Sequence, residues 1–235
     1  MRIRAIFEQS RGTYGSPRIL QALRQQGVSV GRKRVARLMR QSGLKARAVR
    51  IYRRIPGAKR YYTGIPNRQR KFLAQYPNQV WVGDVTYVRR GNQWRFLAVV
   101  MDKCSRKVVG WALGKKRDVN LTLRALTSAV RQRSPEPGLI FHSDRGNEYG
   151  ALIFRKRLTE LGIVQSMNRP RHMTDNACME SFFHSFKSDV YHRNTFSTDD
   201  DLRKMFERYL PFYNQERLHS GIGFVTPVQY ERNLC

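Results

Sequence analysis

The stretch Val80-Trp81-Val82-Gly83-Asp84-Val85-Thr86-Tyr87-Val88 decides the fold. Its β-branched and aromatic residues are apolar on both faces, which is typical of a central strand covered on both sides. Asp84 lies in the middle of this strand. A buried carboxylate without a partner costs several kcal/mol, so a charge at this position requires a cation or a metal ion. The stretch therefore predicts the centre of a sheet with a functional side chain in it.

The segments that follow predict a mixed α/β sheet. Strands at 94–101 and 107–113 complete a three-stranded meander, and an amphipathic helix is expected over 119–132. A short buried strand within 138–146 ends at Asp144, and the carboxyl ends of strands are where open α/β sheets place their ligands. A helix over 148–161 and a short strand at 163–165 come next. The expected sheet has five strands flanked by helices.

A further helix is predicted from about Asp175 to Val190. One side carries a buried apolar stripe, and the other side carries Asn176, Glu180, His184 and Lys187. Glu180 and Lys187 are two turns apart, about 10 Å by the helix rise. A single helical glutamate is usually a solvated side chain, so Glu180 becomes a candidate only together with Asp84 and Asp144.

The net charge points to a polyanionic partner. Lys and Arg number 45 against 17 Asp and Glu, which gives +28, and residues 1–70 carry 19 basic residues and one acid. The longest apolar run is far shorter than the roughly 20 residues that span a bilayer, and no signal peptide is recognisable. Three cysteines without a CxxC pair indicate a reduced, cytoplasmic protein.

The basic N-terminal part has the pattern of a helix-turn-helix. A helix starting at Ser16-Pro17 reaches Gly27, a turn follows, and a second helix spans about Gly31 to Ser42. The local charge favours contact with DNA phosphates over a merely solvated basic face. The predicted domains are a helix-turn-helix domain at 1–55, a linker at 56–75 and a catalytic core with a helical tail at 76–235. The DNA-binding candidates in the second helix are Arg32, Lys33, Arg34, Arg37 and Arg40.

Several ordered motifs together resemble a known family. Asp84, Asp144 and Glu180 are separated by 59 and 35 residues. The matching stretches are Trp81–Tyr87, Met101–Trp111, His142–Tyr149, Asp175–Phe183 with Lys187, and Tyr213–His219 running to Thr226-Pro227, with Gly12–Ile19 near the start. The chain resembles DDE-type transposases and retroviral-like integrases with a ribonuclease H-like core. It is most similar to the OrfB transposases of bacterial insertion sequences of the IS-three type.

The resemblance implies a specific chemistry. Phosphodiester exchange develops charge on the attacking and the leaving oxygen, and two Mg²⁺ or Mn²⁺ ions about 3.5 to 4 Å apart can stabilise both. By the resemblance, Asp84 bridges the two ions, Asp144 and Glu180 each complete one, and Lys187 faces the DNA. The implied partners are double-stranded DNA, at the element ends and the target, and further copies of the chain. A product of an upstream reading frame is another implied partner, because the chain looks like the downstream product alone.

Two other functions stay open at this point. One is a catalytically silent DNA-binding regulator of transposition, which the intact carboxylates disfavour. The other is a ribonuclease H-like nuclease without strand transfer, which the helix-turn-helix and Lys187 disfavour. His172, Cys178 and His184 do not have a zinc spacing, so no zinc is assigned. His142 either contacts substrate or packs under the site, and the signature Tyr213, Asn214, Arg217 and His219 either packs or contacts DNA. A nucleoid-associated location is expected.

Overall fold

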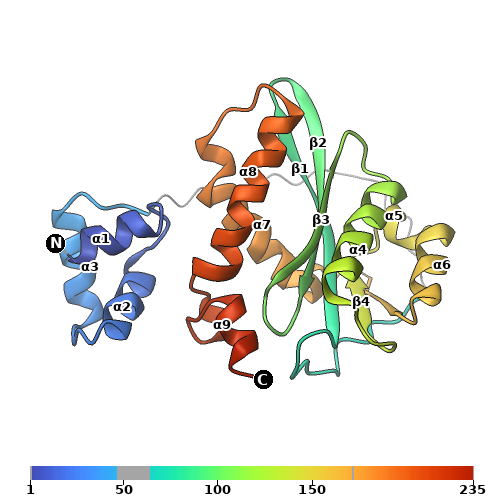
Figure 1. Cartoon of the computed structure of the whole chain (residues 1–235), viewed down its shortest axis with the longest axis horizontal. Helices are drawn as coiled ribbons and strands as arrows, with labels where there is room; N and C mark the ends of the chain where they lie inside the picture. The colour runs from blue at the N-terminus through green and yellow to red at the C-terminus, as the bar shows by residue number, and fades with distance from the viewer. Residues whose placement is uncertain (1, 47–63, 171, 235) are drawn as a thin grey trace.

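A computed structural model describes residues 2–46, 64–170 and 172–234 (Figure 1). The helices are α1 (Arg2–Gln9), α2 (Ser16–Gln25), α3 (Arg32–Gln41), α4 (Val119–Arg133), α5 (Asn147–Gly150), α6 (Leu152–Glu160), α7 (Ala177–Asp189), α8 (Asp199–Pro211) and α9 (Pro227–Arg232). The strands are β1 (Val80–Arg90), β2 (Gln93–Asp102), β3 (Val108–Gly114), β4 (Ile140–Ser143) and β5 (Val164–Met167). Short helical turns are η1 (Met173–Asn176), η2 (Tyr191–Arg193), η3 (Phe212–Glu216) and η4 (Ser220–Ile222).

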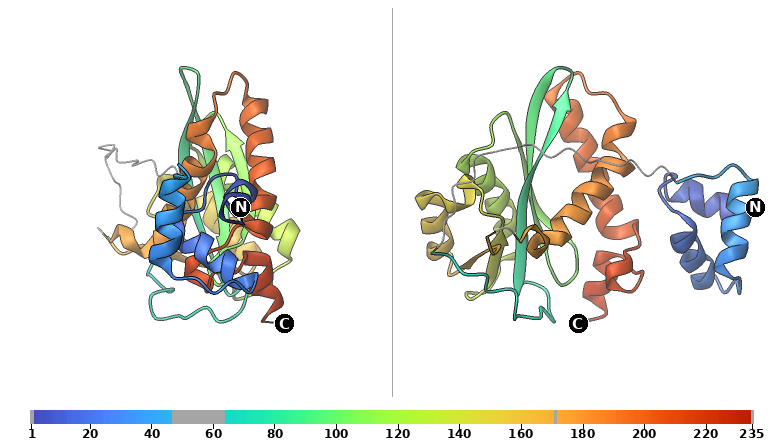
Figure 2. Two further views of the ribbon diagram at one scale, coloured as in Figure 1. Left: turned by 90° about the vertical axis from the view of Figure 1, so that its left-hand side faces the viewer. Right: turned by 180° about the vertical axis from the view of Figure 1, so that it is seen from behind.

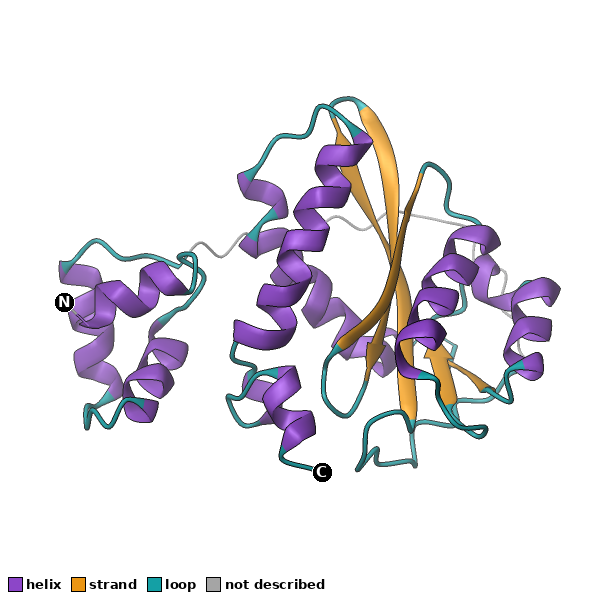
Figure 3. Ribbon diagram, viewed as in Figure 1, coloured by secondary structure: helices purple, strands orange, loops and turns teal. Residues whose placement is uncertain are grey.

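The five strands form one mixed sheet in the order β3-β2-β1-β4-β5 (Figure 3). β1, β2 and β3 pair antiparallel, while β4 runs parallel to β1 and β5 runs parallel to β4. β1 is the central strand, with Trp81 and Val82 both buried on opposite faces. The predicted mixed five-stranded sheet, with a helical unit before it, is confirmed.

Helices cover both faces of the sheet (Figures 1 and 2). Trp81 and Val85 belong to one hydrophobic core with α4 and α6. Val82 and Val88 belong to a second core with α7, α8 and the aromatic residues of η3. This double coverage explains why β1 is apolar on both faces.

The predicted helix over 148–161 is two helices, which corrects that prediction. Ala151 adopts an extended backbone with φ −60° and ψ 138° between α5 and α6. In one continuous helix, Tyr149 and Phe154 would point about 140° apart. The break allows both rings to pack against Phe141, with centroids at 6.0 Å and 5.5 Å. Core packing therefore overrides helix continuity here.

The helix predicted from Asp175 starts differently in the structure. The segment Met173–Asn176 forms the 3-10 turn η1, and the regular helix α7 begins at Ala177. Asp175 is held outside the helix because its carboxylate pairs with Arg169 at 3.0 Å and accepts a hydrogen bond from Asn67 at 2.8 Å. These bonds tie the start of α7 to the segment that precedes β1.

The N-terminal helical unit contains α1, which the sequence reasoning did not predict, together with α2 and α3. Its core includes Ile19 and Val35, and Leu218 from the C-terminal tail packs into the same cluster. The unit lies on the α7–α9 side of the sheet (Figures 1 and 2). Residues 56–63 of the predicted linker at 56–75 lie outside the described residues.

Among the residues that the structure describes, no helix is long and apolar enough to cross a membrane.

Candidate active site

Asp84 and Asp144 are brought together by the parallel pairing of β1 with β4. The last paired residues are Gly83 and Ser143, so the two aspartates follow side by side at the end of β4. Gly83 allows this close packing, since a Cβ there would lie 2.6 Å from Cζ of Phe141. The register thus places side by side two of the three carboxylates that the sequence analysis selected as candidates.

The two carboxylates share a half-buried position with few hydrogen-bond donors. The backbone N–H of Val85 donates to Asp84 Oδ1 at 2.7 Å, and the N–H of Gly146 donates to Asp144 Oδ1 at 3.0 Å. Burial, and secondly the negative charge of Asp144, raise the pKa of Asp84 well above its ordinary value. The negative charges of the two carboxylates repel each other, and a bound cation would relieve this repulsion.

Arg117 and Glu148 also belong to this site, and the sequence reasoning did not select them. Arg117 Nε lies 2.7 Å from Glu148 Oε1, and its Nη2 lies 3.7 Å from Asp144 Oδ2. Glu148 is buried, and its carboxylate folds over Gly146, where a Cβ would lie 2.7 Å from Oε1. Arg117 precedes α4 and therefore supplies a positive charge from a different segment. The only available signal was Glu148 inside the motif 142–149.

Glu180 lies on α7, one turn after Asn176, and is not clustered with the two aspartates in the described residues. Asn176, one turn earlier, donates from Nδ2 to the carbonyl of Gly83 at 3.2 Å, which fixes the start of the helix beside Asp84. Side chains four residues apart share a helix face, so Glu180 lies on the side of Asn176. Glu180 is exposed, whereas Asn176 is buried. The carboxylate of Glu180 is therefore available to a ligand.

The donor chemistry fits a hard divalent cation in part. Two adjacent carboxylates with a raised pKa at Asp84 are the oxygen ligands that Mg²⁺ prefers. In residues 2–46, 64–170 and 172–234, however, no three His, Cys, Asp or Glu side chains are arranged as a complete metal cluster. The structure thus brings Asp84 and Asp144 together, and Glu180 remains the third candidate from the neighbouring helix.

Lys187 is buried rather than solvated. Its side chain is only 8% exposed, and Nζ lies 4.6 Å from the centroid of the Tyr87 ring. Burial lowers the pKa of Lys187, while the charge of Asp84 acts in the opposite direction. The ammonium group therefore lies within the electrostatic reach of the site, and its contact with DNA stays a prediction.

His142 is a packed residue under the site. It is fully buried, with Nδ1 at 2.8 Å from Ser166 Oγ and Nε2 at 2.6 Å from Asn168 Oδ1. Burial lowers the pKa of His142 to about 4. Of the two alternatives for this residue, the structure supports packing between β4 and β5.

The basic residues of α3 are all exposed: Arg32, Lys33, Arg34, Arg37 and Arg40. Val35 and Met39 on the opposite side are buried in the helical unit. Within the described part of the chain, no ion pair involves any of these five residues. The structure thus presents an unneutralised basic helix face, and its contact with DNA remains a prediction.

The C-terminal signature packs instead of lining the site. Asn214 exchanges hydrogen bonds of 3.0 Å with the backbone N–H and carbonyl of Val108. Arg217 forms a buried ion pair with Asp189 of α7 at 2.8 Å. The carbonyl of Leu218 accepts a 2.9 Å hydrogen bond from Arg18 of α2. The signature therefore joins β3, the helix that carries Glu180, and the helix-turn-helix unit.

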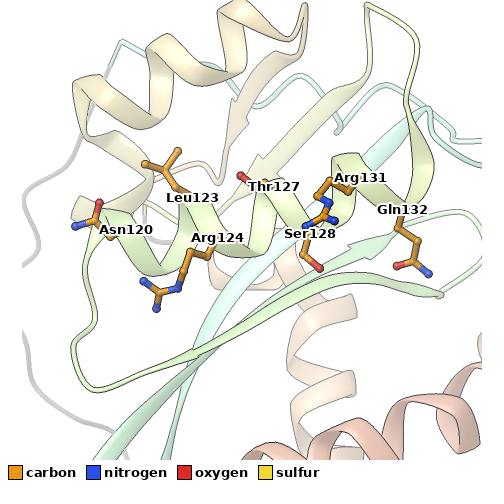
Figure 4. Close-up of a pocket in the computed structure, with 7 residues that line it drawn as sticks. All are labelled: Asn120, Leu123, Arg124, Thr127, Ser128, Arg131 and Gln132. Atoms are coloured by element: carbon orange, nitrogen blue, oxygen red, sulfur yellow. The ribbon is translucent and has the colours of Figure 1, made fainter.

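A surface hollow along α4 is separate from these residues (Figure 4). It is lined by Asn120, Leu123, Arg124, Thr127, Ser128, Arg131 and Gln132. None of the predicted site residues lines it.

The fold and the paired carboxylates define the class of integrase-core proteins. The integrase core domain family matches residues 74–173 and 161–227, and an HTH-like domain family matches residues 1–52. The chain is similar in fold to the HTLV-2 integrase catalytic core domain in complex with magnesium, at a TM-score of 0.50 and 21% identity, covering 66% of this chain and 97% of that one. It also matches a chain of the simian T-cell lymphotropic virus intasome in complex with PP2A regulatory subunit B56 gamma, at a TM-score of 0.59 and 19% identity. That match covers 90% of this chain and 69% of the other.

The similarity to bacterial sequences is higher. The transposase for insertion sequence element IS904 of Lactococcus lactis is 33% identical over 98% of this chain and 92% of the relative. Transposase InsF for insertion sequence IS3A of Escherichia coli is 36% identical over 98% of this chain and 81% of the relative. The chain belongs to the IS3 family of insertion-sequence transposases. It is a nucleic-acid-processing enzyme that acts on DNA, and the resemblance seen in the sequence is confirmed.

Proposed function

We propose that this transposase cuts and joins DNA strands at Asp84, Asp144 and Glu180 with the help of divalent metal ions. The observation that carries the proposal is the pair of adjacent carboxylates at the end of β4, with the pKa of Asp84 raised. Mg²⁺ or Mn²⁺, when bound, supplies charge stabilisation for the attacking and leaving oxygens of phosphodiester exchange.

The residues of the site have different proposed roles in the reaction. Asp84 and Asp144 would hold the divalent cations, and Glu180, exposed on α7, would supply a third carboxylate. Arg117 is paired with Glu148, so it orients that carboxylate and partly neutralises Asp144 in the metal-free protein. Lys187 places a positive charge over Tyr87 beside Asp84, where an incoming phosphate requires a counter-charge.

DNA engagement is assigned to the exposed face of α3. Five basic side chains on one exposed helix supply phosphate contacts that do not depend on sequence. We infer that further copies of the chain and a product of an upstream reading frame join it on the DNA, in the cytoplasm. The regulator hypothesis is less well supported, because a silent protein does not require two repelling carboxylates at a strand end.

The experiment replaces each carboxylate with its amide: Asp84→Asn, Asp144→Asn and Glu180→Gln. Each variant should lose joining of a 3′-hydroxyl element end by a factor of about 10³ or more, because charge stabilisation of this kind contributes several kcal/mol. Binding to the same DNA should change less than about 3-fold, since α3 is untouched. Asp118→Asn, which affects only the N-terminal cap of α4, serves as the matched control. Joining at the wild-type rate by Asp84→Asn would refute the assignment.

A further inference from the structure

Two adjacent aromatic side chains of the β1–β2 hairpin have a cationic side chain at each end, Lys187 of α7 and Arg89 of β1, and this row leads away from Asp84. Lys187 Nζ lies 4.6 Å from the Tyr87 ring centroid, and the Tyr87 and Trp94 rings meet edge to face at 5.2 Å. The guanidinium of Arg89 lies 5.6 Å from the Trp94 ring centroid. We call these four residues, Lys187, Tyr87, Trp94 and Arg89, the aromatic row. It connects the active site with the outer end of the hairpin.

Trp94 is more exposed than the other two tryptophans of the chain. Its exposed fraction is 49%, whereas Trp81 is fully buried and Trp111 is half-buried against Phe206. Trp94 pairs with Arg89 across the hairpin. Arg89 is five residues beyond Asp84, so Trp94 lies about 17 Å from the carboxylates along the strand. DNA rises about 3.4 Å per nucleotide of one strand, so a nucleotide about five steps from the cleaved bond can reach this ring.

The hairpin is held in place at this point. The hydroxyl of Tyr191 accepts a hydrogen bond from the backbone N–H of Arg89 and donates to its carbonyl at 3.3 Å. The Tyr191 ring stacks on Phe196 with centroids 5.8 Å apart. Pairing between β1 and β4 ends at Gly83, so Tyr191 secures an edge of β1 that β4 does not cover. The aromatic row is therefore presented on a preorganised element.

The chemistry of the row favours one ligand. Aromatic side chains beside arginine stack on nucleic-acid bases, and every base offers a π face. Inside a duplex those faces are covered by neighbouring bases, so only an unpaired base can use Trp94. We propose that Trp94, backed by Arg89, binds the face of an unpaired base in the DNA that flanks the cleaved phosphodiester bond. This inference rests on the proposed function, because that function places the cleaved bond at Asp84 and Asp144.

The test compares two DNA ends of equal length and equal phosphate number. One is fully complementary, and the other has three mispaired bases at its end. Without divalent metal, the wild type should bind the mispaired end about 10-fold more tightly, the effect of stacking one base. Trp94→Ala should lose this preference and bind the paired end like the wild type. Trp94→Phe should keep most of it. Tyr76→Ala, an exposed aromatic that precedes the other end of β1, is the matched control and should keep it fully.

Tryptophan fluorescence provides a readout that a structural role would not change. Binding of the mispaired end should lower the emission of the wild type through stacking on Trp94, and this decrease should disappear in Trp94→Phe. The inference is overturned if Trp94→Ala keeps the preference, if it weakens both DNA ends equally, or if the wild-type emission does not change. Because no metal and no bond cleavage enter this assay, its failure leaves the carboxylate assignment intact. Failure of the Asp84→Asn test likewise leaves the preference measurable.

Discussion

Two aspartates on neighbouring strands of the β1–β2 hairpin, Asp84 and Asp102, have contrasting surroundings. Asp102 ends β2 and is fully buried, and its carboxylate accepts backbone N–H bonds from Asn78 at 2.6 Å, Cys104 at 2.9 Å and Ser105 at 3.1 Å. Asp84 accepts a single backbone bond and faces Asp144 instead. The Asp102 carboxylate therefore has its hydrogen bonds satisfied by the backbone, and these bonds close a loop. The Asp84 carboxylate has few hydrogen-bond donors around it.

This difference distinguishes a structural carboxylate from a functional one in the same fold. Burial raises the pKa of both aspartates above the ordinary value. At Asp102, the backbone hydrogen bonds are the next-largest influence, and they lower the pKa. At Asp84, the next-largest influence is a second negative charge. Hydrogen bonds to backbone donors stabilise the folded chain, whereas a neighbouring carboxylate stabilises only a bound cation.

The largest expected difference between the two positions is in stability. Asp102→Ala leaves three buried backbone donors without their acceptor and should lower the free energy of unfolding by about 3 kcal/mol or more. Asp84→Ala in metal-free protein should lower it by less than about 1 kcal/mol or raise it, because repulsion with Asp144 is removed. Urea unfolding of both variants measures this. Equal destabilisation by the two substitutions would erase the distinction.

The smaller expected difference is in pH dependence. The folded-state pKa of Asp84 is raised, so the folded protein binds more protons than the unfolded chain between the two pKa values. The metal-free stability contributed by Asp84 is therefore lost as pH rises through this range. Asp84→Asn should remove this part of the decline. Saturating Mg²⁺ should remove it in the wild type and leave the contribution of Asp102 unchanged. Urea midpoints at several pH values with and without Mg²⁺ test this, and an identical decline in Asp84→Asn would contradict it.

Local patterns were sufficient for much of this site. An aspartate in a doubly apolar strand and another at a strand end were visible in the sequence, so Asp84 and Asp144 could be selected as candidates, and the resemblance added Glu180. Residues that act across long sequence separations could not be predicted in this way. Arg117 reaches Asp144 and Glu148 from the loop before α4, and Leu218 packs into the N-terminal unit from the C-terminal tail. The break at Ala151 also depends on how Tyr149 and Phe154 pack against Phe141, and helical periodicity in the sequence does not reveal that packing.

The most direct test is the location of a bound metal. Crystals of the protein with Mn²⁺ and a DNA end should show anomalous density in contact with carboxylate oxygens of both Asp84 and Asp144, with Glu180 turned toward the same ions. The Asp102 carboxylate should remain bonded to its three backbone donors without metal nearby. Anomalous density that is absent from Asp84 and Asp144, or centred on other carboxylates, would contradict the central claim.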